Sequence, residues 1–380
     1  MPMHPSEAPM SGAVRMRKRL VVIAALCGIY HATSASTAPP AQQDRTPRMA
    51  AIHERVVFAD IHAHPSRFHR ANIERIDDRE IERYRRGFID VVVCNISSDA
   101  AYQGGYTARD GTDVPRLQGN DAYPLKPGDA FAFTLDRLER VLRTIASGSA
   151  ALASSPAAAI EAKRRGTLAL LPALEGADGL EGSLDNLREL HRRGVRLVQL
   201  VHFRDNDLGS NQTPPYEDRG LAPFGRDVIR ESNRLGILVD LAHANTRTIM
   251  DALKTSTEPI LFSHTGAKAL HSADRYLTDD EIRAISAKGG IIGIWPAAEF
   301  KTPAGMVRHI EHVKRLAGVD HVAIGSDLRG MSYFEAFGEE ANFRAIVEGL
   351  MDGGYSDDEI GKIMGGNFLR VWEQVSRGGL

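Results

Sequence analysis

Residue types that bind metals stand at the ends of several apolar runs in this 380-residue chain. They are His62 and His64 in VVFADIHAH, Glu175 in TLALLPALE, His243 in GILVDLAH, His264 in PILFSH and Asp327 in HVAIGSD. A buried parallel strand typically reads as a continuous Val/Ile/Leu run. Barrel and open-sheet enzymes build their sites at the carboxyl ends of such strands. The pattern therefore predicts one convergent metal site.

The ligand types favour zinc and suggest two ions. Residues i and i+2 of a strand point to the same side, so His62 and His64 can bind one cation. We assign His243 and His264 to a second cation and Glu175 to a bridging position. Imidazole and carboxylate are common zinc ligands, and manganese or iron stays an alternative because no sulfur is present. Paired metals ionise a bridging water and polarise a scissile carbonyl.

Each of these residues also has a structural interpretation. The two histidines of the His-x-His pair could be polar strand ends with ordinary hydrogen bonds, and Glu175 could form a buried salt bridge with an arginine. His243 or His264 alone would more often be a hydrogen-bonded core histidine. Their occurrence in adjacent strand units, together with the other ligands, favours the metal site.

Three further residues are candidates for the chemistry. Asp327 could bind metal, cap the following turn, or accept a proton from the attacking water and pass it to the leaving amine. His202, which ends the run LVQLVHF, could donate a hydrogen bond to a developing oxyanion or hold another residue in place. Arg275 could bind a substrate carboxylate as a bidentate pair, or form a surface salt bridge.

The elements that would position these side chains are strands alternating with helices. Eight apolar runs are found, in residues 56–64, 88–97, 167–176, 195–203, 236–244, 259–266, 289–297 and 321–330. Strand–helix alternation implies parallel strands with right-handed crossovers, and eight units are the number in a (β/α)8 TIM barrel. Capping-box patterns at Thr278-Asp-Asp-Glu281 and Ser356-Asp-Asp-Glu359 mark two helix starts, and leucine spacing predicts another helix over residues 183–193.

Two stretches interrupt this alternation. Residues 98–129 are rich in Gly, Asp, Tyr and Pro and show no clear periodicity, and residues 205–218 are polar. A loop of this length inside a domain is usually a lid or a binding loop.

The amino-terminal residues resemble an export signal. Arg17, Lys18 and Arg19 precede an apolar run that is too short for a stable membrane span and a small-residue stretch suited to cleavage. We predict a signal peptide over residues 1–38, with Met16 as an alternative start, a linker over residues 39–50, and a single catalytic barrel over residues 51–380. The protein would then be periplasmic or secreted. An uncleaved anchor is the alternative.

Composition narrows the class further. The chain is 43% hydrophobic with a formal net charge of −2, so it lacks the excess of basic residues that is typical of proteins that bind nucleic acid. Cys94, which would be the one cysteine left after cleavage, lies in an apolar run and is predicted to be a buried thiol. Trp295 and Trp372 are predicted to be packing residues. No GxSxG, HExxH or phosphate-binding loop occurs.

Several motifs together resemble the membrane (renal) dipeptidase family of binuclear zinc peptidases, among the amidohydrolase-like barrels. The resemblance runs from about Val56 to Val375 and is carried by DIHAHP, LPALEGAD, RLVQLVHFRDND, VDLAHAN, PILFSHTGAKAL, DRYLTDDEIRAISAKGGIIGI, VAIGSDLRG and IMGGNFLRVW.

The resemblance implies roles for individual residues. The positions that match the family's metal ligands are His62, Glu175, His243 and His264; His202, Arg275 and Asp327 match its substrate-contacting and acidic positions. The family's first motif usually reads His-x-Asp, whereas this chain has His64 at the third position. A neutral ligand there raises the net charge of the site by one unit. The arginine in VHFRDND is a second departure.

We therefore expect an exported metallohydrolase that cleaves a dipeptide or a similar small amide by attack of a metal-bridging hydroxide. Glu175, Asp327 and His202 would be catalytic, and two divalent ions, preferably Zn²⁺, would be bound. A related barrel hydrolase acting on an N-acyl amino acid, a lactone or a phosphoester is an alternative, as is a non-catalytic binding protein. Oligomeric state is open, with a homodimer as one expectation.

Overall fold

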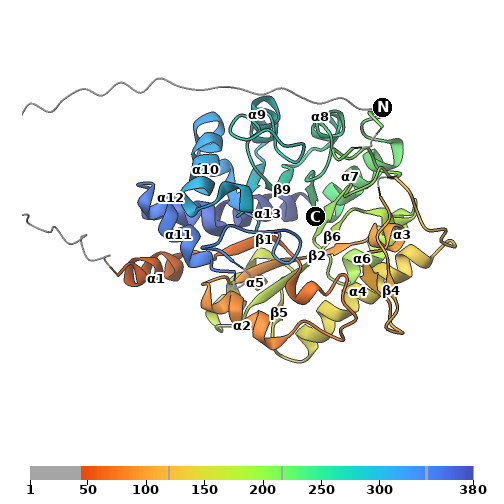
Figure 1. Ribbon diagram of the computed structural model, residues 1–380, viewed down its shortest axis with the longest axis horizontal. Helices are drawn as coiled ribbons and strands as arrows, with labels where there is room; N and C mark the ends of the chain where they lie inside the picture. Colours follow the sequence, from red (N-terminus) through yellow and green to blue (C-terminus); the bar gives the residue numbers. More distant parts are fainter. Residues whose placement is uncertain (1–43, 119, 215–216, 339–340, 380) are drawn as a thin grey trace, which may run out of the picture. The chain divides into compact units, whose positions relative to one another are not determined.

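Eight parallel strands form the centre of the structure, a computed structural model that describes residues 44–118, 120–214, 217–338 and 341–379 (Figure 1). These strands are β1 (Ala59–Ala63), β2 (Val91–Ser97), β6 (Ala169–Glu175), β7 (Leu197–Gln199), β8 (Leu238–Asp240), β9 (Leu261–Thr265), β10 (Ile291–Ile294) and β11 (Val322–Ile324). They pair in that order, so the sheet is parallel with sequential neighbours. The first and last strands meet at an isolated parallel bridge between Ala63 and Leu328. The predicted (β/α)8 TIM barrel is confirmed.

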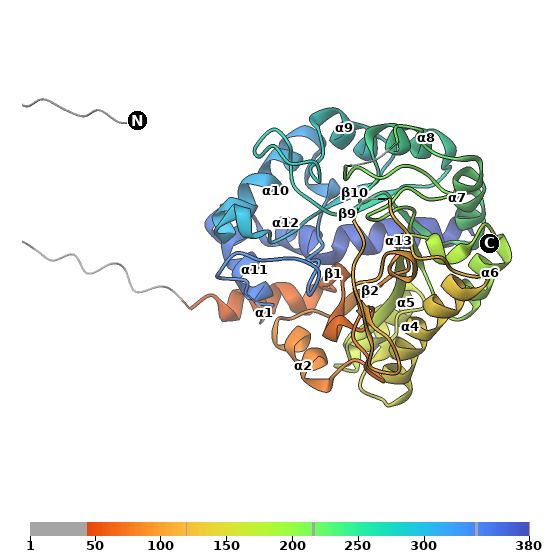
Figure 2. The same ribbon diagram turned by 45° about the vertical axis from the view of Figure 1, so that its right-hand side comes forward.

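Helices lie on the outside of the strands, and α7 to α10 follow one another around the rim in Figure 2. The helices are α1 (Thr46–Arg55), α2 (Asp78–Arg86), α3 (Ala100–Gln103), α4 (Asp129–Ala146), α5 (Pro156–Arg164), α6 (Leu184–Arg192), α7 (Pro223–Leu235), α8 (Thr246–Thr255), α9 (Asp279–Ala287), α10 (Pro303–Ala317), α11 (Phe343–Asp352), α12 (Asp357–Gly361) and α13 (Asn367–Gly378). Among the described residues, no helix has both the length and the apolar character needed to cross a bilayer.

The predicted helix starts are present. Ser183 caps α6, and the reciprocal capping-box bonds form at both Thr278 and Ser356. The helical stretch that begins after Ser356 continues through a π-helical segment, Lys362–Gly366, into α13. Gly365 allows this segment to approach β1 closely, because a Cβ there would lie 2.1 Å from the carbonyl oxygen of Val57.

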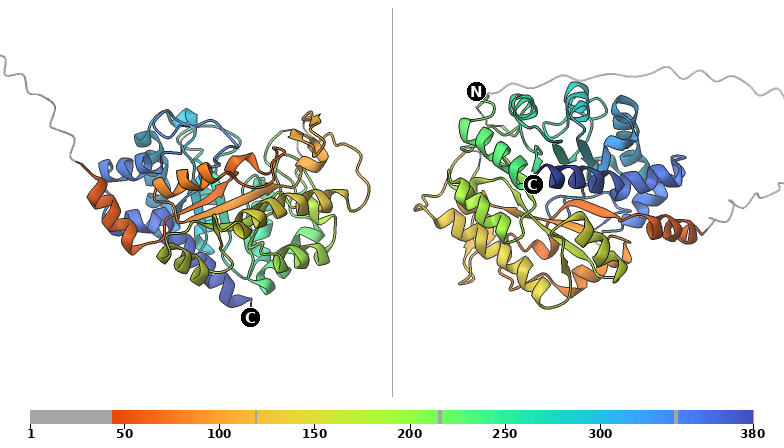
Figure 3. Two further views of the ribbon diagram at one scale, coloured as in Figure 1. Left: turned by 90° about the horizontal axis from the view of Figure 1, so that it is seen from below. Right: turned by 180° about the vertical axis from the view of Figure 1, so that it is seen from behind.

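Small and branched side chains fill the barrel interior, and α13 packs against them from the amino-terminal end of the barrel. Phe368, Val371, Trp372 and Val375 of α13 belong to the same buried cluster as the inward-facing residues of the strands. Since the segment before α13 packs on Val57, which precedes β1, this helix closes the amino-terminal end of the barrel (Figure 3). The carboxyl ends of the strands are left for the candidate site.

The sequence analysis differs from the structure in two segments. Residues 98–129, expected to be without structure, contain α3 and a small hairpin of β3 (Tyr106–Thr107) and β4 (Asp113–Val114). A short strand, β5 (Ala151–Leu152), also pairs with β6.

The amino-terminal region differs in part. The predicted signal segment, residues 1–38, and linker residues 39–43 lie outside the described residues. The linker prediction is wrong for residues 46–50, because α1 begins at Thr46 and buries Met49 and Ile52. The helix was missed because its few apolar residues directly follow a Pro- and Gln-rich stretch and show no clear periodicity. Cys94 is a buried free thiol, as predicted.

Candidate metal centre

The structure brings the predicted ligands together at the carboxyl ends of the strands. His62 lies in β1 and His64 directly after it, Glu175 ends β6, and His264 lies in β9. His243 and Asp327 lie three residues beyond the ends of β8 and β11, in loops rather than in the strands.

Their ligand atoms form two groups that share one carboxylate. His62, His64, Glu175 and Asp327 make the first group, and Glu175, His243 and His264 make the second; within each group the ligand atoms lie within 4.8 Å of one another. Oε1 of Glu175 is 3.2 Å from Nε2 of His62 and 3.7 Å from Nε2 of His243, while Oε2 is 3.3 Å from Nε2 of His64. Glu175 thus stands between the two histidine pairs.

The second group has an arrangement that a cation would stabilise. The Nε2 atoms of His243 and His264 are 3.2 Å apart, and both rings are buried. Burial lowers the pKa of both imidazoles well below the usual value, which favours their neutral forms. Neutral imidazole is the metal-binding form, so these two converging nitrogens fit a divalent cation.

The first group is more strongly charged. Burial alone would raise the pKa of Glu175, but His202, His64 and His62 hold it well below its usual range, so the carboxylate is ionised. Burial alone would lower the pKa of His64, but Glu175 and Asp327 raise it to about 10. A divalent cation would displace the proton of His64, because it binds the neutral imidazole and at the same time neutralises the two carboxylates.

Hydrogen bonds behind the ligands hold them in place. The Ser263 hydroxyl lies 3.0 Å from Nδ1 of His62 and 2.8 Å from Nδ1 of His264. Nδ1 of His64 donates to the carbonyl oxygen of Asn95 at 2.9 Å, and the Ser97 hydroxyl donates to Oε2 of Glu175 at 2.6 Å. These contacts direct each Nε2 toward the centre and fix the ring tautomers.

Irregular backbone conformations set the direction of several of these side chains. The register of β1 against β2 shifts between Asp60 and Ala63, a bulge that redirects side chains next to His62. His243 and Asp327 have positive φ values of 68° and 49°. Non-glycine residues in this region cost about 1–3 kcal/mol and concentrate at functional sites.

Two glycines, one in β10 and one directly after β11, allow the backbone to approach Ser263 closely. A Cβ at Gly293 would lie 1.8 Å from the carbonyl oxygen of Ser263, and one at Gly325 would lie 2.0 Å from it. Any larger residue would therefore displace β9 and with it the adjacent His264.

His202 lies beside this centre with its ring held by Asp99. Nδ1 of His202 donates to Oδ1 of Asp99 at 2.8 Å, and Nε2 lies 3.3 Å from Oε1 of Glu175. Burial alone would raise the pKa of Asp99, but His202 lowers it, so this carboxylate is ionised. This hydrogen bond fixes the ring of His202 so that its Nε2 faces the metal ligands.

Arg275 has an unsatisfied guanidinium. Both Nη atoms are buried and have no hydrogen-bond partner among the described residues, and burial lowers the pKa of this side chain to about 10. Its guanidinium lies 5.3 Å from the ring centre of Trp295. The alternative of a surface salt bridge is wrong for Arg275. A buried cation without a partner is costly unless a ligand supplies the anion.

His64, Glu175, His202, His243, Arg275 and Asp327 line one cavity of about 440 Å³. Its lining also includes residues that the sequence analysis did not single out, among them His69 and Arg116. His69 packs on His64, with ring centres 3.9 Å apart, and Arg116 packs on Phe203. His69 and Asp99 were missed because they lie beyond the strand ends, where no periodicity marks them. The sequence signal that could have found Asp99 is its position two residues after Ser97, the end of β2.

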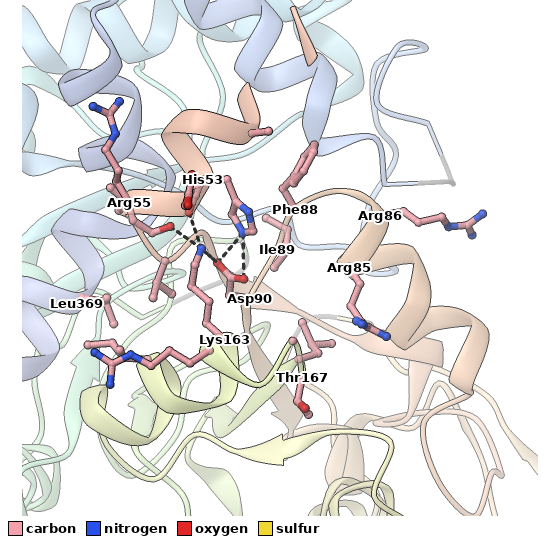
Figure 4. Close-up of a pocket in the computed structure, with 18 of the residues that line it drawn as sticks. His53, Arg55, Arg85, Arg86, Phe88, Ile89, Asp90, Lys163, Thr167 and Leu369 are labelled. Atoms are coloured by element: carbon pink, nitrogen blue, oxygen red, sulfur yellow. Dashed lines mark hydrogen bonds and ion pairs between the residues drawn. The ribbon is translucent and has the colours of Figure 1, made fainter. Parts of the chain in front are cut away.

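A larger cavity, of about 840 Å³, opens at the amino-terminal ends of β1, β2 and β6 (Figure 4). Its central carboxylate, Asp90, is already paired with Lys163 at 2.8 Å and with Nε2 of His53 at 2.9 Å. Asp90 also accepts from the backbone nitrogen of Phe58. These contacts tie α1 and α5 to the strands, and they indicate a structural role at the end of a barrel where stability residues are usual.

Comparison with known proteins agrees with this geometry. A family model described as membrane dipeptidase (peptidase family M19) matches residues 46–378. The dipeptidase tcpJ of Claviceps purpurea (strain 20.1) is 36% identical over 223 residues, which cover 56% of this chain and 52% of that protein. The match thus spans about half the length of that curated relative.

Solved structures share the fold. A probable dipeptidase, PvdM, from Pseudomonas aeruginosa superposes with a TM-score of 0.73 at 19% identity, covering 89% of this chain and 100% of that chain. A metallo peptidase from Rhodobacter sphaeroides, solved with a phosphinate mimic of the dipeptide L-Ala-D-Ala, superposes with a TM-score of 0.71 at 21% identity and covers 84% of this chain and 99% of that chain.

Proposed function

Because this chain belongs to the membrane dipeptidase family, peptidase family M19, we propose that it hydrolyses the peptide bond of a dipeptide or a similar small amide with two divalent cations. The observation that carries the proposal is the pair of ligand groups that share Glu175, in one cavity with Arg275, whose Nη atoms have no hydrogen-bond partner among the described residues. The similarity to dipeptidases supports it.

We assign the ligands as two pairs with a bridge. His62 and His64 would hold one cation, His243 and His264 the other, and Glu175 both. Zinc fits best, since all the ligands are imidazole nitrogens and carboxylate oxygens. When bound, such cations make water more acidic and polarise the scissile carbonyl.

The chain's own residues account for the remaining steps. Arg275 binds the terminal carboxylate of the dipeptide, because its buried Nη atoms find no acceptor in the part of the chain that the structure describes. His202 donates from Nε2 to the carbonyl oxygen as that oxygen gains negative charge. The carboxylate of Asp327, whose Oδ1 lies 3.4 Å from Nε2 of His64, takes the proton of the attacking water and transfers it to the leaving nitrogen.

Hydrolysis of a dipeptide panel by the purified protein tests the proposal. The protein is assayed as isolated, after treatment with a chelator, and after zinc is restored, and its metal content is measured at each step. We expect two metals per chain, turnover of at least one dipeptide, and loss and recovery of turnover with the metal. Lactone or phosphoester turnover without dipeptide turnover, or one metal or none per chain, would overturn it.

We also propose that the protein is exported, on the basic, apolar and small-residue pattern of its first 38 residues. Fractionation of bacterial cells that express the full chain, followed by amino-terminal sequencing, tests this proposal. A mature protein outside the cytoplasm that begins near residue 39 supports it. A full-length protein confined to the cytoplasm contradicts it.

A further inference from the structure

The cavity around the candidate metal centre carries an excess of arginines. Two carboxylates that line it, Glu175 and Asp327, both face the histidines. Five arginines line the same cavity, namely Arg67, Arg70, Arg116, Arg275 and Arg329. A cavity lined this way attracts anions even before metal adds further positive charge.

These arginines differ in how far they are neutralised. Arg329 forms an ion pair with Glu80, with Nη2 and Oε2 3.2 Å apart. Arg275 is already assigned to the terminal carboxylate of the substrate, and Arg67 is exposed. Arg70 and Arg116 are left, and neither has a carboxylate within ion-pairing distance among the described residues.

Arg70 is held in a fixed position by neutral acceptors. Its Nη1 atom donates to the carbonyl oxygens of Gly104 and Gly105 at 3.3 and 3.0 Å, and its Nε donates to Nε2 of His69 at 3.1 Å. These acceptors fix the position of the guanidinium but do not neutralise its charge. Such a group can bind an anion through charge-assisted hydrogen bonds.

Arg116 lies next to Arg70. Its guanidinium carbon is 4.2 Å from the ring centre of Phe203, and the side chains of Arg70 and Arg116 both border Gly105. Burial and the charge of Arg70 lower the pKa of Arg116. Two like charges held this close repel each other, and a shared anion would relieve that repulsion.

The barrel places this pair across the site from Arg275. Arg70 lies in the segment after β1, whereas Arg275 lies in the loop after β9. Arg116 closely follows β4, in the long segment between β2 and β6, and borders Gly105 together with Arg70. In the order of the strands, three strands separate β2 from β9 on one side and two separate β9 from β1 on the other. A dipeptide with its terminal carboxylate at Arg275 thus directs its amino-terminal residue toward Arg70 and Arg116.

From this arrangement we propose that the enzyme prefers dipeptides whose amino-terminal residue carries an acidic side chain, bound by Arg70 and Arg116. This inference rests on the proposed dipeptidase function and adds a substrate class to it. The side-chain carboxylate would accept charge-assisted hydrogen bonds from both guanidinium groups, which an isosteric amide cannot match.

Isosteric substrate pairs test the inference. kcat/KM is measured for Glu-Ala against Gln-Ala, and for Ala-Glu against Ala-Gln, with Ala-Ala as a neutral reference. We expect wild type to prefer Glu-Ala over Gln-Ala about tenfold or more, mainly through KM, and to lose part of that preference at high salt. A preference for Ala-Glu over Ala-Gln instead would overturn the placement.

Variants identify the residues responsible. R116Q is the main variant, because no hydrogen bond from the Arg116 side chain to the described residues would be lost. We expect the ratio of Glu-Ala to Gln-Ala to fall toward one in R116Q and in R70Q, and to be better kept in R70K. The matched control is R79Q, which removes one exposed positive charge on α2 outside this cavity and should leave the ratio unchanged.

The two proposals fail in different ways. If no dipeptide is hydrolysed, the proposed function is wrong. If Ala-Ala is hydrolysed but Glu-Ala and Gln-Ala are equivalent in wild type, or if R116Q keeps the full ratio, the acidic-substrate inference is wrong and the dipeptidase proposal stands. Inhibition by L-glutamate stronger than by L-glutamine gives a readout of binding that does not depend on turnover of the test substrate.

Discussion

Asp99 accepts a hydrogen bond from Nδ1 of His202 at 2.8 Å, which leaves Nε2 of His202 facing Glu175. The carboxylate therefore orients the ring. This effect does not require Asp99 to touch the substrate, so Asp99 is a positioning residue.

We expect D99N to lower kcat by about 10–100-fold, the usual effect of losing such a support. The amide keeps the size of the side chain, so metal content should stay at the wild-type level. KM should change less than kcat, because only the orientation of the His202 ring is lost. Steady-state kinetics with metal analysis check this. A normal kcat in D99N would show that Asp99 only packs.

We expect Arg275 to lower the stability of the substrate-free protein while it contributes to substrate binding. Its two buried Nη atoms have no hydrogen-bond partner within the described ranges, so R275M should stabilise the substrate-free protein by about 1–3 kcal/mol. The same change should raise KM about tenfold or more, because the terminal carboxylate of the substrate loses its cation. Chemical denaturation and steady-state kinetics measure the two effects.

The control for R275M is R283M. Arg283 lies on the exposed side of α9, paired with Asp280 at 3.0 Å, and its replacement should change stability by no more than about 0.5 kcal/mol. A loss of stability in R275M comparable to that of a core truncation would mean that Arg275 is a structural residue.

His64 allows a test of the charge of the metal centre. H64D replaces a neutral ligand by an anionic one at a position next to Glu175 and Asp327. We expect two metals to remain and their release to a chelator to be about tenfold slower or more, because the added negative charge attracts the cations. Metal content during timed exposure to chelator measures this, with H64A as the variant that should lose metal. Faster release from H64D than from wild type would contradict the assignment.

We expect His309, which is not one of the metal ligands, to make the free energy of unfolding depend on pH. Its ring stacks on Phe300 and its Nδ1 accepts from the backbone nitrogen of Ala267, and burial lowers its pKa to about 4. In the unfolded chain the pKa is about 6.5. The unfolded state therefore binds more protons between these values, and stability should fall as pH decreases from about 6.5 to about 4.

H309Q should lose this dependence. Denaturant unfolding at pH 4.5 and pH 7 should show a smaller difference in H309Q than in wild type, by about 1–2 kcal/mol after allowance for solvent screening. H309Q is expected to be less stable at both values because the stacking is lost, so the difference between the two pH values is the readout. Equal differences in the two proteins would assign acid sensitivity to other groups.

Much of the barrel could be predicted because its strands are buried on both faces. Each strand then reads as an apolar run, and all eight runs contain a strand of the sheet. The helix starts at Thr278 and Ser356 were predictable for a local reason, since a capping box is formed by residues only three apart. Residues that end the runs, such as Glu175 and His264, came together because parallel strands end on one side.

What could not be predicted depends on long-range contacts or on backbone conformation. Asp99 gains its role only from His202, which lies more than one hundred residues away. The bulge in β1 and the positive φ values of His243 and Asp327 leave no trace in composition. Arg70 and Arg116 lie in loops, and their sequence positions do not show that they meet.

The seam between the first and last strands has a consequence for the first ligand group. The barrel closes where His64 donates its backbone N–H to Leu328 and Asp327 donates its own to His62. The same residues therefore join the ends of the sheet and contribute to the first ligand group. The carboxylate of Asp327 therefore reaches the histidines of the first group only when the last strand docks against the first. Any change that loosens this seam should move the proton-accepting carboxylate away from the ligands while leaving the second ligand group intact.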